Sequence, residues 1–202
     1  MDFKDGTMKI RPNNGAAMKQ FVWVGDEGPS WMRDETYMVI RSTRIALEHW
    51  DRMELGCQEE TGGRHKYSGA PIGKQHEFDP MDFDVNDNDG NPVSAESAHA
   101  RLAAPANNGG AEILRRAYAH DNGVASIAEP WPPWRQAMTF DAGLLFQCYQ
   151  RDPRTGFTKI FEKKAKLDML NQFTTHIGGG LFACPPSAEQ GEYIEQRLFE
   201  QV

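Results

Sequence analysis

The order of strand-like and helix-like patterns constrains the fold of this 202-residue chain more than any other feature. Strand-like runs are rich in β-branched and aromatic residues, and helix-like runs repeat apolar residues every three or four positions. They follow one another as strand 36–41, helix 45–60, strand 112–118, strand 142–149, helix 161–176 and strand 181–184. This is the split βαβ, or ferredoxin-like, order. The sequence therefore predicts an α+β fold whose four-stranded antiparallel sheet carries helices on one face and leaves the other for a ligand or a partner.

Further segments surround this pattern. Residues 1–34 are rich in Gly, Asn and charge and predict an extended arm with a short strand at 21–24, and residues 188–199 predict a last helix. Residues 62–110 are dominated by Gly, Pro, Asp and Asn, and an irregular insertion of this length inside a compact domain is usually functional or disordered. We therefore divide the chain into the arm, 1–34, and a ferredoxin-like domain, 35–202.

Composition excludes several classes of function. The net charge of −7 and the pI near 5.4 would repel a phosphate backbone, so no nucleic-acid partner is expected. No apolar run is long enough to cross a bilayer, so no membrane span is expected. The three cysteines lie far apart and fit neither a disulfide framework nor a Cys-x-x-Cys metal site. The first residues show no export signal, but a signal could precede residue 1, which leaves cytoplasmic and exported locations open.

One stretch of the chain brings chemistry-bearing residues together. Ser94 predicts the N-cap of a helix that stops before Pro105, and His99 lies near its middle between two alanines that would let a large flat ligand approach the imidazole. A polar turn then leads into the strand that carries Arg115 and Arg116. We expect one imidazole and two guanidiniums to share a site here. The alternative is a hydrogen-bonded or surface histidine beside arginines on a solvated face.

Short motifs spread over nearly the whole chain point to a known family. They are Phe3-Lys-Asp-Gly-Thr7, Glu48-His-Trp-Asp-Arg52, Gly63-Arg64 with Ser68-Gly-Ala-Pro71, His99-x-Arg-Leu-Ala103 with Pro105, Leu114-Arg-Arg116, Asp141-Ala-Gly-Leu-Leu-Phe146 with Tyr149-Gln150, and Ile177-Gly-Gly-Gly180. In this order they resemble the dye-decolourising peroxidases, especially the subgroup also described as deferrochelatases. The resemblance implies a haem b peroxidase built from two ferredoxin-like halves, and this chain is similar to the C-terminal, haem-binding half.

The resemblance also implies roles for single residues. His99 matches the proximal ligand, whose imidazole binds haem iron through one nitrogen while a carboxylate on the other nitrogen raises its basicity. Our candidate for that carboxylate is Asp141, which could equally cap its strand as a surface residue. Asp5 matches the distal aspartate that shuttles the peroxide proton, and Arg115 matches the distal arginine that stabilises negative charge. An aspartate base predicts best activity at acidic pH, because its ordinary pKa is about 3.9.

Other residues are candidates for the surroundings of such a site. Arg64 and Arg101 are predicted to pair with the haem propionates, with surface salt bridges as the alternative. Four aromatic residues either relay electrons from dyes too bulky to enter or simply pack in the core: Tyr118, Trp131, Trp134 and Tyr149.

Other metal sites are not expected. Residues 87–96 imitate part of a calcium-binding loop, but Val85 stands where the first ligand belongs and no helix precedes it. His65 and His76, with Cys57, lack the spacing of zinc ligands.

The resemblance implies a haem peroxidase that reduces hydrogen peroxide and oxidises dyes, phenols or similar small aromatic donors. Two alternatives stay open: a truncated haem-binding protein with little turnover, and a deferrochelatase-type protein that releases iron and leaves the porphyrin ring intact. RNA binding, which ferredoxin-like folds also support, lacks its aromatic and basic sequence pattern here. A bare sheet of this kind would expose apolar surface, so we expect a homo-oligomer or packing against the N-terminal half.

Overall fold

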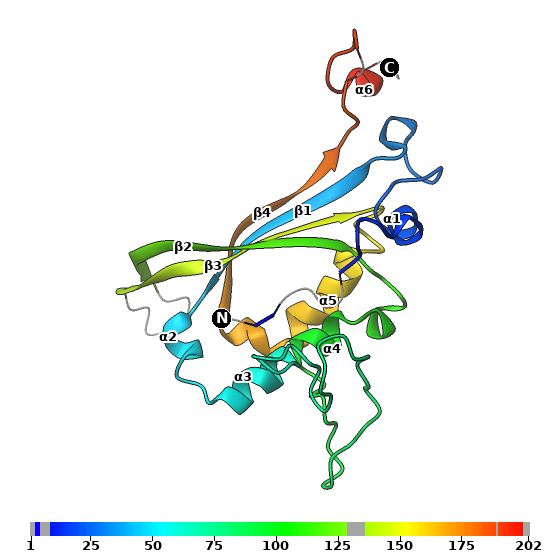
Figure 1. The fold of residues 1–202 in the computed structure, drawn as a ribbon. Coiled ribbons are helices and arrows are strands. Elements are labelled where there is room, and N and C mark those ends of the chain that lie inside the picture. The colour runs from blue at the N-terminus through cyan, green and yellow to red at the C-terminus, as the bar shows by residue number, and fades with distance from the viewer. Residues whose placement is uncertain (1–2, 5–8, 129–135, 189, 200–202) are drawn as a thin grey trace.

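The computed structural model describes residues 3–4, 9–128, 136–188 and 190–199. Its centre is a four-stranded antiparallel sheet in the order β2-β3-β1-β4 (Figure 1). The strands are β1 Thr36–Ile45, β2 Leu114–Ala128, β3 Gln136–Gln150 and β4 Thr174–Cys184. The central strand β1 pairs with β3 on one side and β4 on the other, and β2 pairs with β3. This order is the ferredoxin-like arrangement, so the predicted fold class is confirmed.

Short helices and 3-10 turns occupy the connections. They are α1 Gly15–Phe21, η1 Ser30–Met32, α2 Leu47–Trp50, α3 Leu55–Gly62, α4 His99–Ala103, η2 Pro105–Asn108, α5 Phe157–Leu167, η3 Met169–Gln172 and α6 Gln196–Phe199. In Figure 1 the helices α2 to α5 lie below the sheet, and the irregular segment between α3 and α4 extends furthest from it. Within the described ranges, no helix is long and apolar enough to cross a membrane.

The core lies between the sheet and α5. Val39 of β1 and Cys148 of β3 are buried against Ile160 of α5, and the half-buried Phe146 packs beside them. Successive residues of a strand point to opposite faces, so Tyr149 packs on the other side of the sheet, in the cluster built around α1. Full burial of each large apolar side chain contributes roughly 1.5–3 kcal/mol. The α5 face of the sheet is therefore the one that the long connections fold onto.

The helical period of α5 carries this packed face into a polar end. Ile160, Phe161 and Lys164 recur at spacings of three and four, which place them on one side of the helix. Asp168 follows on the same side, and its carboxylate accepts a hydrogen bond from the backbone N–H of Leu170 at 3.0 Å, which begins η3. The stripe that packs against the sheet thus ends in a lysine and a carboxylate.

The helix predicted at 45–60 is divided into two. α2 ends at Trp50 and α3 begins at Leu55 after a turn. The buried side-chain amide of Gln58 donates to the carbonyl oxygens of Trp50, at 3.0 Å, and Met53, at 3.2 Å. This amide satisfies backbone groups next to the break, so the prediction of one helix was wrong for a tertiary reason that periodicity does not show.

The helix predicted from Ser94 is much shorter. α4 begins at His99, directly behind Ala98, and it ends before Pro105 as predicted. Ser94 is buried outside the helix, and its carbonyl oxygen accepts a hydrogen bond from Arg101 Nη1 at 2.6 Å. His99 therefore stands in the first turn of its helix and not in the middle.

The glycine run at 178–180 lies inside β4 and is not the break that the sequence suggests. A Cβ atom at Gly179 would lie 2.5 Å from the carbonyl oxygen of Ile40 in the neighbouring strand, so only glycine allows this approach. β4 also includes Thr174–His176, which were expected to end the preceding helix. The predicted helix at 188–199 shrinks to α6, and residues 21–24 form no strand.

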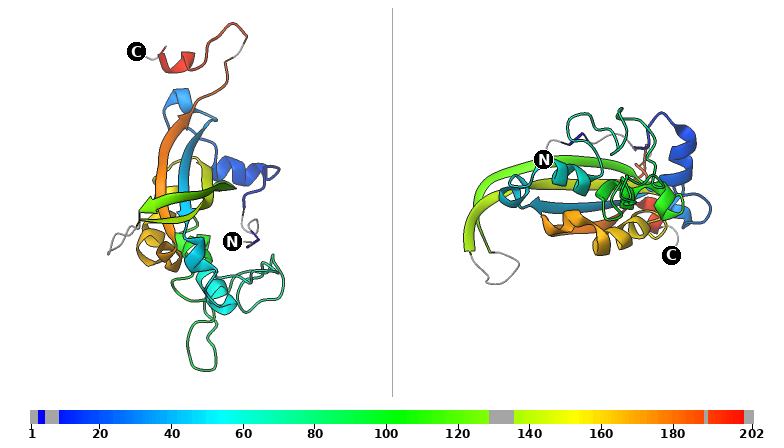
Figure 2. Two further views of the ribbon diagram at one scale, coloured as in Figure 1. Left: turned by 90° about the vertical axis from the view of Figure 1, so that its left-hand side faces the viewer. Right: turned by 90° about the horizontal axis from the view of Figure 1, so that it is seen from below.

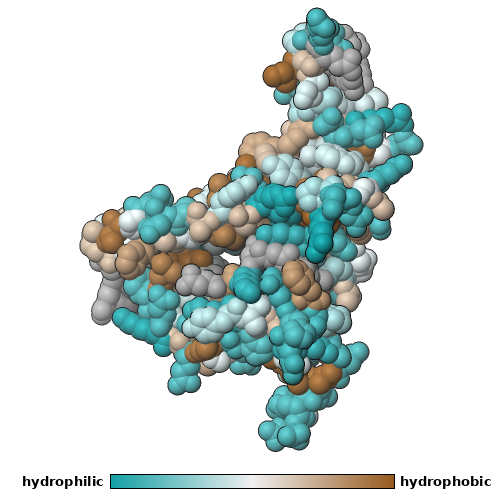
Figure 3. All heavy atoms as spheres, viewed as in Figure 1, coloured by the Kyte–Doolittle hydropathy of each residue, from teal (hydrophilic) through white to brown (hydrophobic). Residues whose placement is uncertain are grey.

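β2 and β3 continue beyond β1 as a two-stranded ribbon. β1 pairs with residues 143–150 of β3, whereas residues 136–142 pair with β2 alone. Val124, Met138 and Phe140 are exposed on this ribbon. Figure 2 shows it curving away from the rest of the sheet, and in Figure 3 apolar residues gather at that end of the molecule.

Candidate functional site

His99 lies between a carboxylate and an ammonium group. Its Nδ1 is 2.7 Å from Oδ2 of Asp168, and its Nε2 is 3.0 Å from Nζ of Lys164. Both partners come from the end of α5, where the Lys164 and Asp168 side chains are 3.9 Å apart. α4 packs against α5, and the backbone N–H of Met169 donates to the carbonyl oxygen of Ser97 at 3.2 Å. The position of the imidazole is therefore set by two elements that are far apart in sequence.

The electrostatics of this pair favour one protonation state. Burial lowers the pKa of His99, the Lys164 charge adds to this shift, and Asp168 opposes it. Burial alone would raise the pKa of Asp168, but the hydrogen bond from His99 and the nearby positive charges lower it. At neutral pH a neutral imidazole thus donates its Nδ1 proton to an ionised Asp168, which leaves the lone pair on Nε2. A histidine that ligates a metal through Nε2 needs this tautomer.

Three cations lie near the pair formed by His99 and Asp168, namely Lys164, Arg115 and Arg41. Burial lowers the pKa of Lys164 to about 8; Asp168 opposes this shift, whereas Arg115 and Arg41 add to it. The Arg41 guanidinium also lies over the Phe161 ring, 4.0 Å from its centroid. Positive charge exceeds negative charge in this group, so the site favours an anionic ligand.

Strand alternation determines which arginine joins the site. Arg115 is paired with Cys148, and Cys148 is buried in the cluster between the sheet and α5. Arg116, the next residue, is paired with Gln147 and so points to the opposite face, where its Nη1 donates to the carbonyl oxygen of Arg115 at 3.2 Å. The expectation that two guanidiniums of this strand share the site with His99 is wrong for Arg116. The second arginine on the α5 face is Arg41 of β1.

The carboxylate that bonds to His99 is Asp168 and not the predicted Asp141. Asp141 accepts a hydrogen bond from Asn122 Nδ2 at 3.1 Å across the exposed ribbon, whereas Asp168 bonds to the imidazole. The assignment of Asp141 as the partner of His99 is therefore corrected to Asp168. The sequence places Asp168 inside the predicted helix 161–176, and the early end of α5 at Leu167 frees it for this contact. The spacing of four from Lys164 is the one local signal that could have indicated it.

The other predicted residues are distributed as follows. Asp5 lies outside the described residues. Arg64 Nη1 donates to the carbonyl oxygens of Gly69, at 2.7 Å, and Glu77, at 3.2 Å. Arg101 donates to the Ser94 carbonyl oxygen, and its guanidinium is 5.3 Å from the Phe83 ring centroid. These contacts tie down the irregular segment between α3 and α4, and they leave the pairing of Arg64 and Arg101 with propionates a prediction.

The two described aromatic candidates for electron relay differ in burial. Tyr149 packs against the α1 cluster, as expected of a core residue, and Tyr118 is 55% exposed on β2. Trp131 and Trp134 lie outside the described residues.

Among the described residues, no group of three or more His, Cys, Asp or Glu side chains could hold a metal ion by itself. Asp87 instead accepts hydrogen bonds from the backbone N–H groups of Asp89 and Asn91, both at 2.9 Å, as in an ordinary turn. His65 pairs with Glu59 at 2.8 Å. The structure therefore gives no support to a calcium or zinc site in the part of the chain that it describes.

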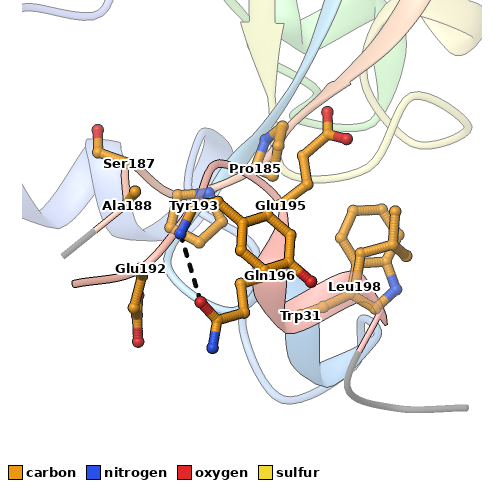
Figure 4. A pocket seen from close by; sticks show the side chains of 10 residues that line it. Trp31, Pro185, Ser187, Ala188, Glu192, Tyr193, Glu195, Gln196 and Leu198 are labelled. Atoms are coloured by element: carbon orange, nitrogen blue, oxygen red, sulfur yellow. Dashed lines mark hydrogen bonds between the residues drawn. The ribbon is translucent and has the colours of Figure 1, made fainter.

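Some surface pockets of the described part of the chain lie away from His99. One, of about 310 Å³, is bounded by Lys9, Glu112, Pro105 and residues 78–81. Another is a small hollow where the C-terminal segment folds over Trp31, and Figure 4 shows Tyr193 and Leu198 on its wall. Neither includes His99, so the candidate site is defined by its side chains and not by these hollows.

Fold and site together define a class of protein: a ferredoxin-like domain in which an arginine of the sheet lies near a histidine of α4 that is bonded to a buried carboxylate. The model of the Dyp-type peroxidase C-terminal region matches residues 1–189. The chain therefore belongs to the dye-decolourising, or DyP-type, peroxidase family.

Individual relatives agree with this assignment. A dye-decolorizing peroxidase of Thermobifida fusca is 39% identical over 172 residues, which cover 85% of this chain and 37% of the relative. A deferrochelatase of Escherichia coli strain K12 is 34% identical over 203 residues, covering 98% of this chain and 45% of the relative. The crystal structure of a DyP-type peroxidase from Streptomyces coelicolor superposes with a TM-score of 0.86 at 36% identity, covering 98% of this chain and 51% of that one. This chain thus spans between 37% and 51% of the length of these three proteins.

Proposed function

We propose that this chain binds haem b through Nε2 of His99 and forms the haem-binding half of a peroxidase. The observation that carries the proposal is the hydrogen bond from His99 Nδ1 to Asp168, at 2.7 Å, in a setting that keeps the imidazole neutral. Hydrogen peroxide is the proposed oxidant, and dyes, phenols or similar aromatic compounds are the proposed donors. Membership of the DyP-type family supports both assignments.

The residues around His99 fit haem chemically. Imidazole nitrogen is a common axial ligand of haem iron, and a carboxylate on the other ring nitrogen raises its basicity. Arg41 and Arg115 supply positive charge that two propionate groups would neutralise. Half-buried Phe146, on the sheet face that α5 covers, supplies apolar surface for a porphyrin ring.

The chain's own residues have separate tasks in the proposed reaction. Bound haem would supply the electron exchange with peroxide and donor. Asp168 holds the imidazole in the ligating tautomer and stabilises positive charge on it. Arg115, held on the α5 face by the pairing of β2 with β3, would stabilise the negative charge that builds up on the peroxide oxygens. Asp5 is proposed to shuttle the peroxide proton, a role that rests on the sequence motif.

The decisive test compares the two neighbouring arginines. Each variant would be loaded with haemin, and dye oxidation by hydrogen peroxide would be followed at steady state. We expect Arg115→Ala to lower the rate about 10²–10³-fold, as for the loss of one donor that stabilises developing charge. Arg116→Ala, on the opposite face of the same strand, should stay within a factor of about three. Equal losses in both variants would contradict the proposed role of Arg115.

A second candidate function is deferrochelatase-type iron release, or haem binding with little turnover. The deferrochelatase of Escherichia coli among the relatives supports this candidate. Product analysis separates the two. Iron-free protoporphyrin, detected by its fluorescence after incubation with haem, would support iron release, whereas oxidised dye with intact haem would support the peroxidase.

We also propose that the sheet face away from α5 packs against another protein surface, either a second copy or the N-terminal half found in full-length relatives. Tyr118 is 55% exposed and Phe182 48% exposed, and their strand partners Leu145 and Met38 place both on this face. Light scattering on the purified chain tests the first alternative. A monodisperse monomer would exclude self-association through this face.

A further inference from the structure

We propose that Lys164 is an internal competitor for iron at His99, so that haem binding exchanges a protein ammonium group for the metal. The inference rests on the proposed haem binding at His99 and adds a residue that the binding must displace. Lys164 approaches the imidazole on the nitrogen opposite to Asp168, at 3.0 Å from Nε2.

The competition follows because the imidazole offers only one lone pair for bonding. A neutral imidazole with its proton on Nδ1 has a single lone pair in the ring plane, on Nε2. In the structure this lone pair accepts a hydrogen bond from the Lys164 ammonium. Iron bound to Nε2 would use the same lone pair, so ammonium and iron cannot both occupy it.

The surroundings explain why the ammonium lies there. Arg41 and Arg115 repel it from the sheet side, and the two groups that attract it are His99 and Asp168. α5 fixes the stem of Lys164 one turn before Asp168, so the ammonium reaches both. With Nε2 occupied by a metal, the flexible lysine stem would carry the ammonium toward Asp168, now 3.9 Å away.

The contact also orients the ring in advance. Asp168 on one nitrogen and Lys164 on the other hold the imidazole in the tautomer that iron requires. Loss of Lys164 should therefore have two effects of opposite sign: the chain without added haem becomes less ordered at His99, while haem binds more tightly. A lysine with a purely structural role would weaken both.

The test uses Lys164→Met, which keeps the length of the side chain without its charge. Haemin would be titrated into each purified chain at pH 7 and followed by the Soret band. We expect the dissociation constant of Lys164→Met to fall about tenfold, since a hydrogen bond to a charged group no longer has to be broken. Lys164→Arg keeps a cation and should bind close to wild type. The matched control is Lys163→Met, whose ammonium bonds the Asn107 carbonyl oxygen away from His99.

A second measurement needs no haem. The nitrogen-15 chemical shift of His99 Nε2 should change in Lys164→Met and not in Lys163→Met, because one hydrogen bond to that nitrogen is lost. An unchanged shift in a folded Lys164→Met chain would overturn the proposed competition regardless of the haemin titration. Haemin binding by Lys164→Met that is equal to or weaker than that of wild type would also overturn it. Absence of a Soret shift in the wild type and every variant would instead refute the proposed function, and the nitrogen shift would still decide the position of Lys164. If Lys164→Met does not fold, Lys164→Gln takes its place in both measurements.

Discussion

Two histidines in this chain bond to carboxylates at almost the same distance, yet they occupy different chemical settings. His99 Nδ1 lies 2.7 Å from Asp168, and His65 Nδ1 lies 2.8 Å from Glu59. The Asp168 side chain is 2% exposed and lies beside Lys164, whereas the Glu59 side chain is 16% exposed and also accepts the backbone N–H of Lys66. Pairing with a carboxylate is therefore not what marks a candidate ligand. The burial of the acceptor and the charges around the other ring nitrogen distinguish His99.

The strongest way to test this comparison is to remove each ring in turn. His99→Ala should weaken haemin binding more than about 100-fold, since loss of the axial ligand exceeds the 10–100-fold typical of its outer partners. His65→Ala should leave the dissociation constant unchanged within a factor of two. Soret titration of both variants measures the difference. Equal binding by the two would show that His99 does not ligate the iron.

The pH dependence of stability tests the setting of the buried Lys164 beside His99. The pKa of Lys164 is about 8 in the folded chain against an ordinary value of 10.5, so the unfolded chain holds more protons between these values. The free energy of unfolding should therefore rise as the pH rises from about 8 to 10.5, by up to roughly 3 kcal/mol, because the folded chain no longer buries a charge. Urea denaturation of wild type and Lys164→Met at several pH values checks this. A parallel pH profile in the two chains would contradict it.

The acceptors provide the next test. Asp168→Asn keeps the shape of the side chain but removes its negative charge, and it should weaken haemin binding about 10–100-fold. Glu59→Gln is the matched change at the other pair and should leave haemin binding unchanged. Titration of both under identical conditions measures the ratio. A loss of affinity in Glu59→Gln as large as that in Asp168→Asn would mean that the two pairs are equivalent.

Acid should remove the contribution of Asp168 to stability. The pKa of Asp168 is lowered in the folded chain, so its contribution is complete above the ordinary value of about 3.9 and is lost as the pH falls through the folded value. Wild type should therefore lose more stability than Asp168→Asn between pH 5 and pH 2. Thermal denaturation followed by circular dichroism compares the two chains. A larger loss in the variant would reverse the assigned sign.

The smallest effect is expected at the half-buried pair of His65 and Glu59. Glu59→Gln should lower the free energy of unfolding by about 1 kcal/mol, the usual net value of a hydrogen bond, because it weakens the contact to His65. Chemical denaturation at pH 7 measures it. A cost well above that of Asp168→Asn would show that the His65–Glu59 pair contributes more to stability than the His99–Asp168 pair.

The sequence is enough to predict the sheet because strand order depends on local periodicity and on a small number of allowed connections. It does not reveal the break between α2 and α3, since that break depends on Gln58 reaching back to Trp50. Asp168 is missed for a related reason. Its contact joins residues 69 positions apart, and it requires α5 to end at Leu167, one residue before Asp168. His99 and Arg115 could be named from motifs, whereas Arg41 and Lys164 enter through packing alone.

Because Arg115 and Arg116 are consecutive on β2, the register of this strand against β3 decides which guanidinium lies on the side of His99. A slip of one position relative to β3 would turn Arg115 outward and bring its neighbour Arg116 inward. One inserted or deleted residue near the start of β2 could thus retain a positive charge beneath the sheet while displacing every apolar side chain beside it. Evolution of this region by insertion would then be limited by hydrophobic contacts before it was limited by catalysis.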